Sequence, residues 1–111
     1  MMKQRGADKP LYRNMSRAEA DAVRETGVLQ GGRPGEPYWT DSRFRSADRA
    51  QDRLPLPERP EVQMECRLRG SPAMERNGTR VAPDYGGRGG GREYMSTEPV
   101  EVETINVQPY R

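Results

Sequence analysis

Two segments of the chain alternate regularly between apolar and polar residues. In residues 61–68, EVQMECRL, every second residue is apolar, and residues 99–109, PVEVETINVQP, alternate in the same way until the phase slips near Ile105 and Val107. An alternation with a period of two is typical of a strand with one buried face. A slip within such a segment indicates a β-bulge. The pattern therefore predicts two late strands, the second of them bulged.

Two short helices are predicted earlier in the chain from their capping residues. Residues 16–27 begin with the capping-box pair Ser16 and Glu19, in which each side chain bonds a free backbone N–H, and a glycine ends the segment. Residues 46–54 begin with Ser46 and run into a proline-rich segment that cannot continue a helix.

The remaining segments predict short strands and connectors. PLYRNM at 10–15 and YWTDS at 38–42 are the strand candidates, and residues 30–37 form a loop by their Gly and Pro content. Residues 69–79, RGSPAMERNGT, predict a turn-rich connector with a tight turn at Asn77–Gly78. With helices early and antiparallel strands late, the expected class is α+β.

The composition allows one small domain with a thin core. Only 14 of the 111 residues are Leu, Ile, Val or Phe, a content that raises disorder as an alternative. The net charge of +2 is far from the high charge that favours disorder. Residues 1–9 are expected to be a linker or an expression remnant, and residues 10–111 a single domain. No apolar run is long enough to span a bilayer, so we expect no membrane insertion by this domain.

The residues available exclude several kinds of chemistry. The chain has one cysteine and no histidine. This excludes an internal disulfide and every nucleophile that depends on a histidine base. A metal site would have to be built from carboxylates alone, and we expect none.

The most unusual segment is VAPDYGGRGGGREYM, residues 81–95. A phosphate-binding loop is disfavoured, because a strand rather than a helix follows the glycines. A flexible linker is a second interpretation, against which stand the flanking Tyr85 and Tyr94. The third is a mobile loop that delivers Glu93 at the start of a strand, where a carboxylate can bond a ribose hydroxyl and stabilise positive charge as a leaving group departs. For a single Glu, a solvated surface position is the alternative.

Three segments together resemble the small C-terminal ADP-ribosyltransferase-like toxin domains of bacterial polymorphic toxins, including those carried by Rhs proteins. These are residues 11–29, 38–62 and 81–107, so the resemblance spans nearly all of 10–109. The glycines followed by Glu-Tyr also look like the GGG-x-Q-Y segment of bacterial NAD glycohydrolase toxins, with Glu93 in place of Gln. The resemblance implies a split, strongly bent β-sandwich, here with two short helices early in the chain, that binds NAD in its cleft.

The resemblance also assigns roles to site residues. Glu93 would be catalytic, bonding the nicotinamide ribose and facing the oxocarbenium-like state. Arg13 would hold the phosphate or ribose of NAD, while Thr40 and Ser42 would organise the nicotinamide pocket. The aromatic residues that could stack on the nicotinamide are Tyr12, Tyr38, Trp39 and Tyr94.

Each of these residues also has a plainer interpretation. Arg13 could be a surface residue on an edge strand, and Thr40 and Ser42 could be a strand residue and a turn residue. Trp39 could be the main core residue of so thin a domain.

The leading function implied is an NAD-dependent mono-ADP-ribosyltransferase toxin that modifies a protein or RNA inside a competitor bacterium, with NAD as substrate and no metal. Transferases that modify arginine commonly carry Glu or Gln two residues before the catalytic Glu, where this chain has Gly91, so arginine is a disfavoured acceptor. One alternative is an NAD glycohydrolase on the same fold. Another is an RNA-binding module without catalysis, because 17 Arg and an RG-rich loop with tyrosines could grip RNA.

The resemblance further implies a partner and a place of action. A cognate immunity protein is expected in the producing cell. The domain would be delivered as the C-terminal part of a larger secretion-system effector in interbacterial competition and would act in the cytoplasm of the target cell.

Overall fold

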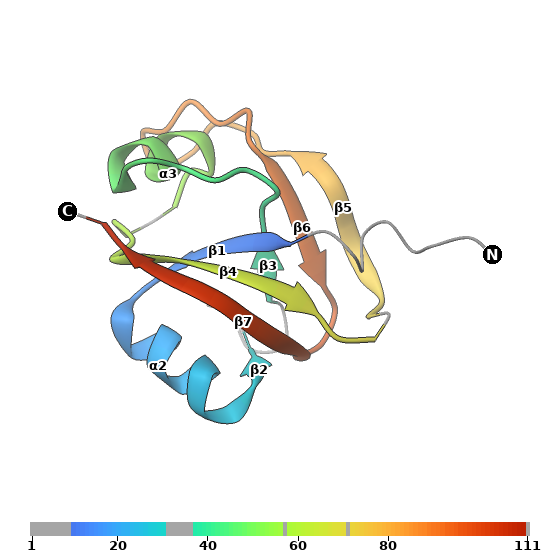
Figure 1. The fold of residues 1–111 in the computed structure, drawn as a ribbon. Helices are drawn as coiled ribbons and strands as arrows, with labels where there is room; N and C mark the ends of the chain where they lie inside the picture. Colours follow the sequence, from blue (N-terminus) through green and yellow to red (C-terminus); the bar gives the residue numbers. More distant parts are fainter. Residues whose placement is uncertain (1–9, 31–36, 57, 71, 111) are drawn as a thin grey trace.

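The structure is a computed structural model that describes residues 10–30, 37–56, 58–70 and 72–110 (Figure 1). The expected linker at 1–9 and most of the loop predicted at 30–37 lie outside these residues. The described elements are β1 (Leu11–Met15), α2 (Arg17–Thr26), β2 (Val28–Leu29), β3 (Tyr38–Trp39), α3 (Ala47–Arg53), β4 (Val62–Leu68), β5 (Met74–Arg80), β6 (Arg92–Ser96) and β7 (Val100–Pro109).

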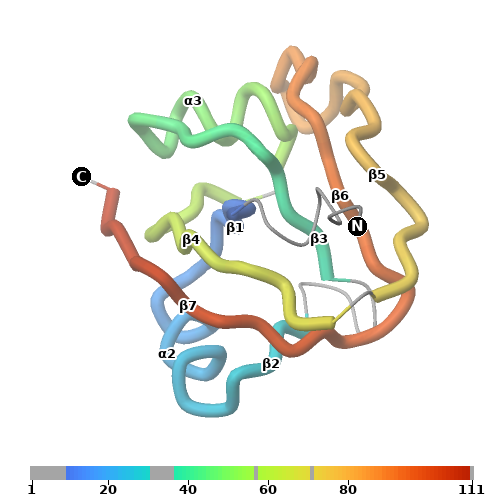
Figure 2. Tube along the Cα trace, turned by 45° about the vertical axis from the view of Figure 1, so that its right-hand side comes forward, coloured from blue at the N-terminus to red at the C-terminus, as the bar shows by residue number. Residues whose placement is uncertain are grey.

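The described strands form two antiparallel sheets that meet at a bridge. The first sheet has the order β1-β4-β7-β2 and the second β3-β6-β5. Tyr12 of β1 and Thr40, directly after β3, exchange two backbone hydrogen bonds of 2.8 Å. Figure 2 shows the strands following one another around a bend, with α2 and α3 on opposite sides of it. The predicted α+β class is confirmed, and the curled pair of sheets is consistent with a split, bent β-sandwich.

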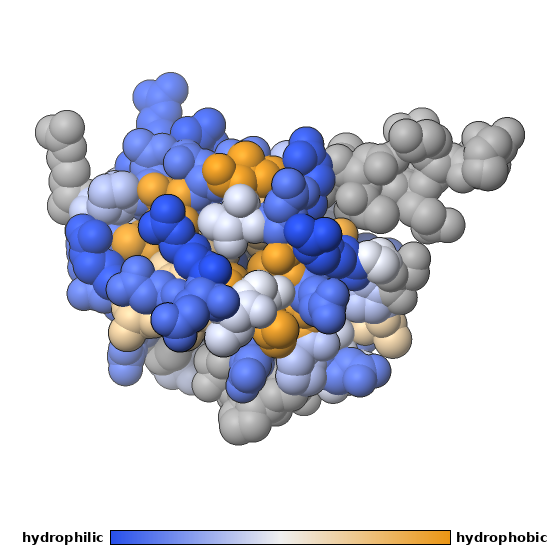
Figure 3. All heavy atoms as spheres, turned by 60° about the horizontal axis from the view of Figure 1, so that its bottom comes forward, coloured by the Kyte–Doolittle hydropathy of each residue, from blue (hydrophilic) through white to orange (hydrophobic). Residues whose placement is uncertain are grey.

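The core lies between the first sheet and α2. The alternating faces of β1 and β4 are buried there, together with Ala20 and Val23 of α2. Trp39 joins from the second sheet and is only 2% exposed. On the face seen in Figure 3, hydrophobic residues form separate patches among hydrophilic ones. No helix in the described ranges is long and apolar enough to cross a membrane.

Both helices begin where their caps predict. The Ser16 hydroxyl accepts from the Glu19 backbone N–H at 3.1 Å, Ser46 caps α3 in the same way, and Gly27 ends α2 at φ +73°. The second half of the predicted capping box does not form, because the Glu19 carboxylate bonds Arg13 instead. The bond from the Arg13 guanidinium joins two ionised groups and is therefore charge-assisted.

The segment at 69–79 corrects the sequence interpretation. It contains most of β5 and is not a turn-rich connector. Gly78 has a φ of +81°, but it lies where the pairing with β6 shifts register between Asn77 and Thr79. The conformation that makes Asn-Gly a turn signal serves here in a strand irregularity.

The bulge predicted in the last strand is confirmed. Cys66 of β4 pairs with Thr104, whereas Glu65 pairs with Asn106, which leaves Ile105 as the extra residue. Its side chain is 40% exposed. The extra residue restores the phase of the strand, so that Val107 packs against the core on the same side as Val102.

Candidate functional site

A narrow pocket lies where β1, β3 and β6 meet the segment after α3. Its lining contains six of the eight predicted site residues, and Ser42 and Tyr94 are not among them. The lining residues are Tyr12, Arg13, Asn14, Tyr38, Trp39, Thr40, Leu54, Leu56 and Glu93. The fold thus gathers into one place side chains from four segments that are distant in the sequence. The cavity holds only about 10 Å³, roughly the space that one water molecule needs, so a ring-sized ligand requires lining side chains to shift.

Glu93 borders the pocket at the start of β6. Its side chain is 19% exposed, and its Oε1 lies 3.1 Å from the Arg76 guanidinium on β5. The ion pair orients the carboxylate from the neighbouring strand. Sequence analysis missed Arg76, because residues 69–79 were expected to be a connector and not the strand beside Glu93.

Arg13 is 4% exposed and joins three elements across the split between the sheets. Its Nε donates to Glu19 Oε2 at 3.0 Å, and its NH2 lies 2.9 Å from the same oxygen. Its NH1 donates to the Tyr38 carbonyl at 3.0 Å, and the guanidinium carbon lies 4.6 Å from the centre of the Tyr38 ring. Arg13 is therefore buried, not a surface residue, and each of its three nitrogens already has a partner in the fold.

Thr40 and Ser42 form a turn beside the pocket. The Thr40 side chain is buried, and its Oγ1 accepts from the Ser42 N–H at 3.2 Å. Ser42 Oγ donates to Asp41 Oδ1 at 3.4 Å, and the Tyr94 hydroxyl donates to Asp41 Oδ2 at 3.3 Å. Burial, and then the Asp41 carboxylate, raise the pKa of Tyr94. Asp41 thus ties Ser42 and Tyr94 together outside the pocket, while Thr40 reaches its wall.

Trp39 belongs to the core and touches the pocket from that side. Its indole N–H is buried without a hydrogen-bond partner among the described oxygen and nitrogen atoms. Cys66 lies near it, and burial raises the pKa of this thiol to about 12, while the Trp39 N–H acts in the opposite direction. A thiol with so high a pKa is not a nucleophile at neutral pH.

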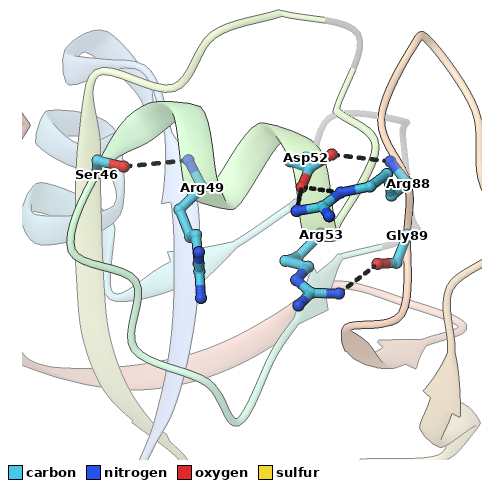
Figure 4. A network of polar contacts seen from close by, with 6 residues as sticks. All are labelled: Ser46, Arg49, Asp52, Arg53, Arg88 and Gly89. Carbon is cyan, nitrogen blue, oxygen red and sulfur yellow. Dashed lines mark hydrogen bonds and ion pairs between the residues drawn. The ribbon is translucent and has the colours of Figure 1, made fainter.

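The glycine-rich loop that leads into β6 is fastened to the C-terminal half of α3 (Figure 4). Arg88 donates to both oxygens of the Asp52 carboxylate at 2.9 Å, once from its backbone N–H and once from Nε. The Gly89 N–H donates to the Asp52 carbonyl at 2.8 Å, and the Gly91 N–H donates to the Arg53 carbonyl at 3.1 Å. Contacts from both backbone and side chains therefore hold this loop in place.

Close approach, and not mobility, explains these glycines. A Cβ on Gly87 would lie 2.8 Å from two carbonyl oxygens of α3, and a Cβ on Gly91 would lie 2.9 Å from the Leu54 side chain and 3.0 Å from the Arg53 carbonyl. The expected mobile loop is instead a docked one. Its docking fixes the backbone two residues before Glu93.

No group of three or more Cys, Asp or Glu that could hold a metal ion occurs in the part of the chain that the structure describes.

The fold is similar to that of Tne2, solved in complex with Tni2. The TM-score is 0.68 at 12% identity, and the similar region covers 93% of this chain and 87% of the Tne2 chain. At this identity the similarity concerns the fold alone. No protein-family model and no curated protein matches this chain.

Proposed function

We propose that this chain is a toxin domain that cleaves the bond between nicotinamide and ribose in NAD and passes the ADP-ribosyl group to water. The observation that carries the proposal is the pocket itself, where Glu93 meets Arg13, Thr40 and two aromatic residues of β3. These residues come from separate segments, and the family resemblance assigns them to one site.

The toxin role rests on similarity of fold. Tne2 and Tni2 are a toxin and its immunity protein. A shared fold does not establish a shared activity, so this role is an analogy that the chemistry of the pocket supports. By the same analogy, an immunity protein is the expected partner.

The chemistry needs one carboxylate. The Glu93 carboxylate would accept a hydrogen bond from a hydroxyl of the nicotinamide ribose and face the positive charge that develops at C1′. The C1′–N bond breaks, and its electron pair leaves with nicotinamide. Water then adds to C1′ and releases a proton, which gives ADP-ribose. Arg76 would keep the carboxylate oriented throughout, since it bonds Oε1 from β5.

The surroundings of Gly91 support water as the acceptor. Transferases that hold an arginine substrate commonly use a side chain at this position, two residues before the catalytic Glu. Any side chain here would collide with Leu54 and with the Arg53 carbonyl. Transfer to RNA is the second candidate, favoured by Tyr85, which is 65% exposed in the same loop as Arg88.

The pocket must widen before it can bind nicotinamide. Leu54 and Leu56 line it from the segment after α3, and Arg13, which also lines it, is held in place by Glu19. Displacing either leucine side chain breaks no hydrogen bond. We therefore expect Leu56→Ala, which removes bulk from this wall, to lower KM for NAD.

The test is to incubate the purified domain with NAD and quantify nicotinamide and ADP-ribose by chromatography. Glu93→Gln keeps the shape of the side chain and should slow cleavage by about 100-fold or more. Glu75→Gln, an exposed carboxylate on β5, is the matched control and should leave the rate unchanged. A folded wild-type domain that leaves NAD intact would refute the proposal.

A second arm separates the acceptors. Radiolabelled NAD is added to a bacterial lysate, and protein and RNA fractions are counted separately. Label that enters either fraction in a Glu93-dependent manner would identify a transferase. Label recovered only as ADP-ribose would identify a glycohydrolase. Induced expression of the domain in bacteria should deplete NAD and stop growth, and Glu93→Gln should do neither.

A further inference from the structure

A second cavity adjoins the Glu93 pocket and is much larger. It has a volume of about 550 Å³, within the roughly 300–1,000 Å³ of small-molecule sites. Its borders are the segment 43–46 before α3, Gln63 of β4, and residues 108–110 at the end of β7. We refer to it as the arginine groove, after Arg43 and Arg45.

A buried amide holds the segment that carries these arginines. Gln63 is 4% exposed, and its Oε1 accepts from the Phe44 N–H at 2.8 Å while its Nε2 donates to the Phe44 carbonyl at 3.0 Å. Both polar groups of the Phe44 backbone are thus paired as they would be by a neighbouring strand. Arg43 and Arg45, on either side of this fixed residue, both border the groove.

The groove combines the groups that recognise a nucleotide. Guanidinium groups match the geometry of phosphate oxygens and bind them with paired hydrogen bonds. Phe44 and Tyr110 add half-buried aromatic rings to the same lining, and aromatic rings provide stacking surfaces for a base. Arginines and aromatic residues around one cavity therefore favour a ligand with both phosphate and a purine.

The pocket and the groove adjoin at one hydrogen-bonded pair. The Tyr110 hydroxyl, in the groove, donates to Oδ1 of Asn14, which lines the Glu93 pocket. The Nδ2 of Asn14 is buried and has no partner among the described residues. An elongated ligand that occupies both cavities would pass this unpaired donor.

The contacts of Arg13 within the fold favour a second cationic site for the phosphates. A dinucleotide carries two phosphates, and the nitrogens of Arg13 already bond Glu19 and the Tyr38 carbonyl. We propose that the arginine groove binds the phosphate-bearing adenosine end of the dinucleotide, through Arg43 and Arg45, while the nicotinamide end occupies the Glu93 pocket. This inference rests on the proposed function and adds to it the place of the other half of the substrate.

The test measures binding of AMP by calorimetry and, separately, KM and kcat for NAD. The double variant Arg43→Gln/Arg45→Gln is compared with Arg67→Gln/Arg80→Gln, which removes two exposed arginines from β4 and β5. The groove variant should weaken AMP binding by about tenfold or more and raise KM for NAD to a similar extent, with kcat within about twofold. The control variant should change neither. Thermal unfolding of both variants checks that they remain folded.

The outcomes separate this inference from the proposed function. If the wild type cleaves NAD and the groove variant has the KM of the control, the adenosine end binds elsewhere and the inference is wrong. If the wild type does not bind AMP, it is equally wrong. If AMP binds through Arg43 and Arg45 but NAD is not cleaved, the groove stands as a nucleotide site and the proposed reaction fails.

Discussion

Two glycines of the loop before β6 allow the contribution of its close internal packing to be measured. Gly86 and Gly89 have almost the same positive φ, +78° and +77°. A Cβ at Gly86 would meet nothing within 4 Å, whereas a Cβ at Gly89 would lie 2.5 Å from the Val81 carbonyl oxygen. Substitution by alanine therefore imposes a positive φ on a residue with a Cβ at both positions and a collision at only one.

The expected losses in the free energy of unfolding follow from the strain and from the collision. Left-handed strain should cost each variant about 1–2 kcal/mol. The collision at Gly89 involves a backbone oxygen that cannot rotate away, so Gly89→Ala should lose about 1–3 kcal/mol more. It would also displace the Gly89 N–H from the Asp52 carbonyl, 2.8 Å away. For a domain of this size, the extra loss corresponds to about 4 °C or more in Tm.

The assay is urea unfolding of the two variants beside the wild type, followed by circular dichroism. Gly89→Ala should unfold at a clearly lower urea concentration than Gly86→Ala, with the same dependence on denaturant. Equal midpoints would show that the close approach of Gly89 to Val81 contributes nothing to stability and would refute the reasoning.

Three further predictions follow from other contacts. Arg88 holds the pKa of Asp52 below its ordinary 3.8, so the stabilisation by this pair is complete above that pH and is lost as the pH falls through the lower folded-state pKa. Arg88→Ala should therefore reduce the dependence of Tm on pH between about pH 4 and 2, and an unchanged pH profile would contradict this. Gln63→Leu leaves both backbone groups of Phe44 unpaired and should lower the free energy of unfolding by about 1–3 kcal/mol, measured in urea; an unchanged midpoint would mean that water replaces the amide. Burial raises the pKa of the Cys66 thiol to about 12, so Ellman's reagent at pH 8 should react only as fast as the domain unfolds, and a reaction at the rate of free cysteine would show that the thiol is accessible.

The elements that sequence analysis predicted are those with a purely local cause. Ser16 and Ser46 cap their helices because the side chain bonds a backbone N–H three residues away. The bulge at Ile105 was visible because it interrupts a strict alternation. In each case the deciding interaction, or the pattern that reports it, lies within one segment.

The contacts that sequence analysis missed depend on what another segment brings near. Gln63 occupies a position that the alternation assigned to the exposed face, but Phe44 folds over it and it becomes buried. Arg76 pairs with Glu93 only because Gly78 lies within a strand, and Asn-Gly has the same local preference in a turn. Glycines at 87–91 permit either motion or close contact, and only the position of α3 decides between them.

The six pocket residues were predicted on a different basis. A family resemblance assigned Glu93, Arg13 and Thr40 to one site, and the fold then brought them to one cavity. The resemblance did not indicate that Glu19 forms an ion pair with the Arg13 guanidinium. The sequence pattern assigned Glu19 to a capping box instead.

The position of β7 has a consequence for how the domain folds. β7 is the last strand of the described chain, yet it pairs with β4 on one side and β2 on the other, inside the first sheet. A nascent chain that lacks β7 leaves β2 without a partner strand and exposes an open edge on β4. Pairing across such sequence distances is slow, on the order of milliseconds to seconds. The domain should therefore remain unfolded through most of its synthesis and gain its structure, and with it the Glu93 pocket, in one late cooperative step.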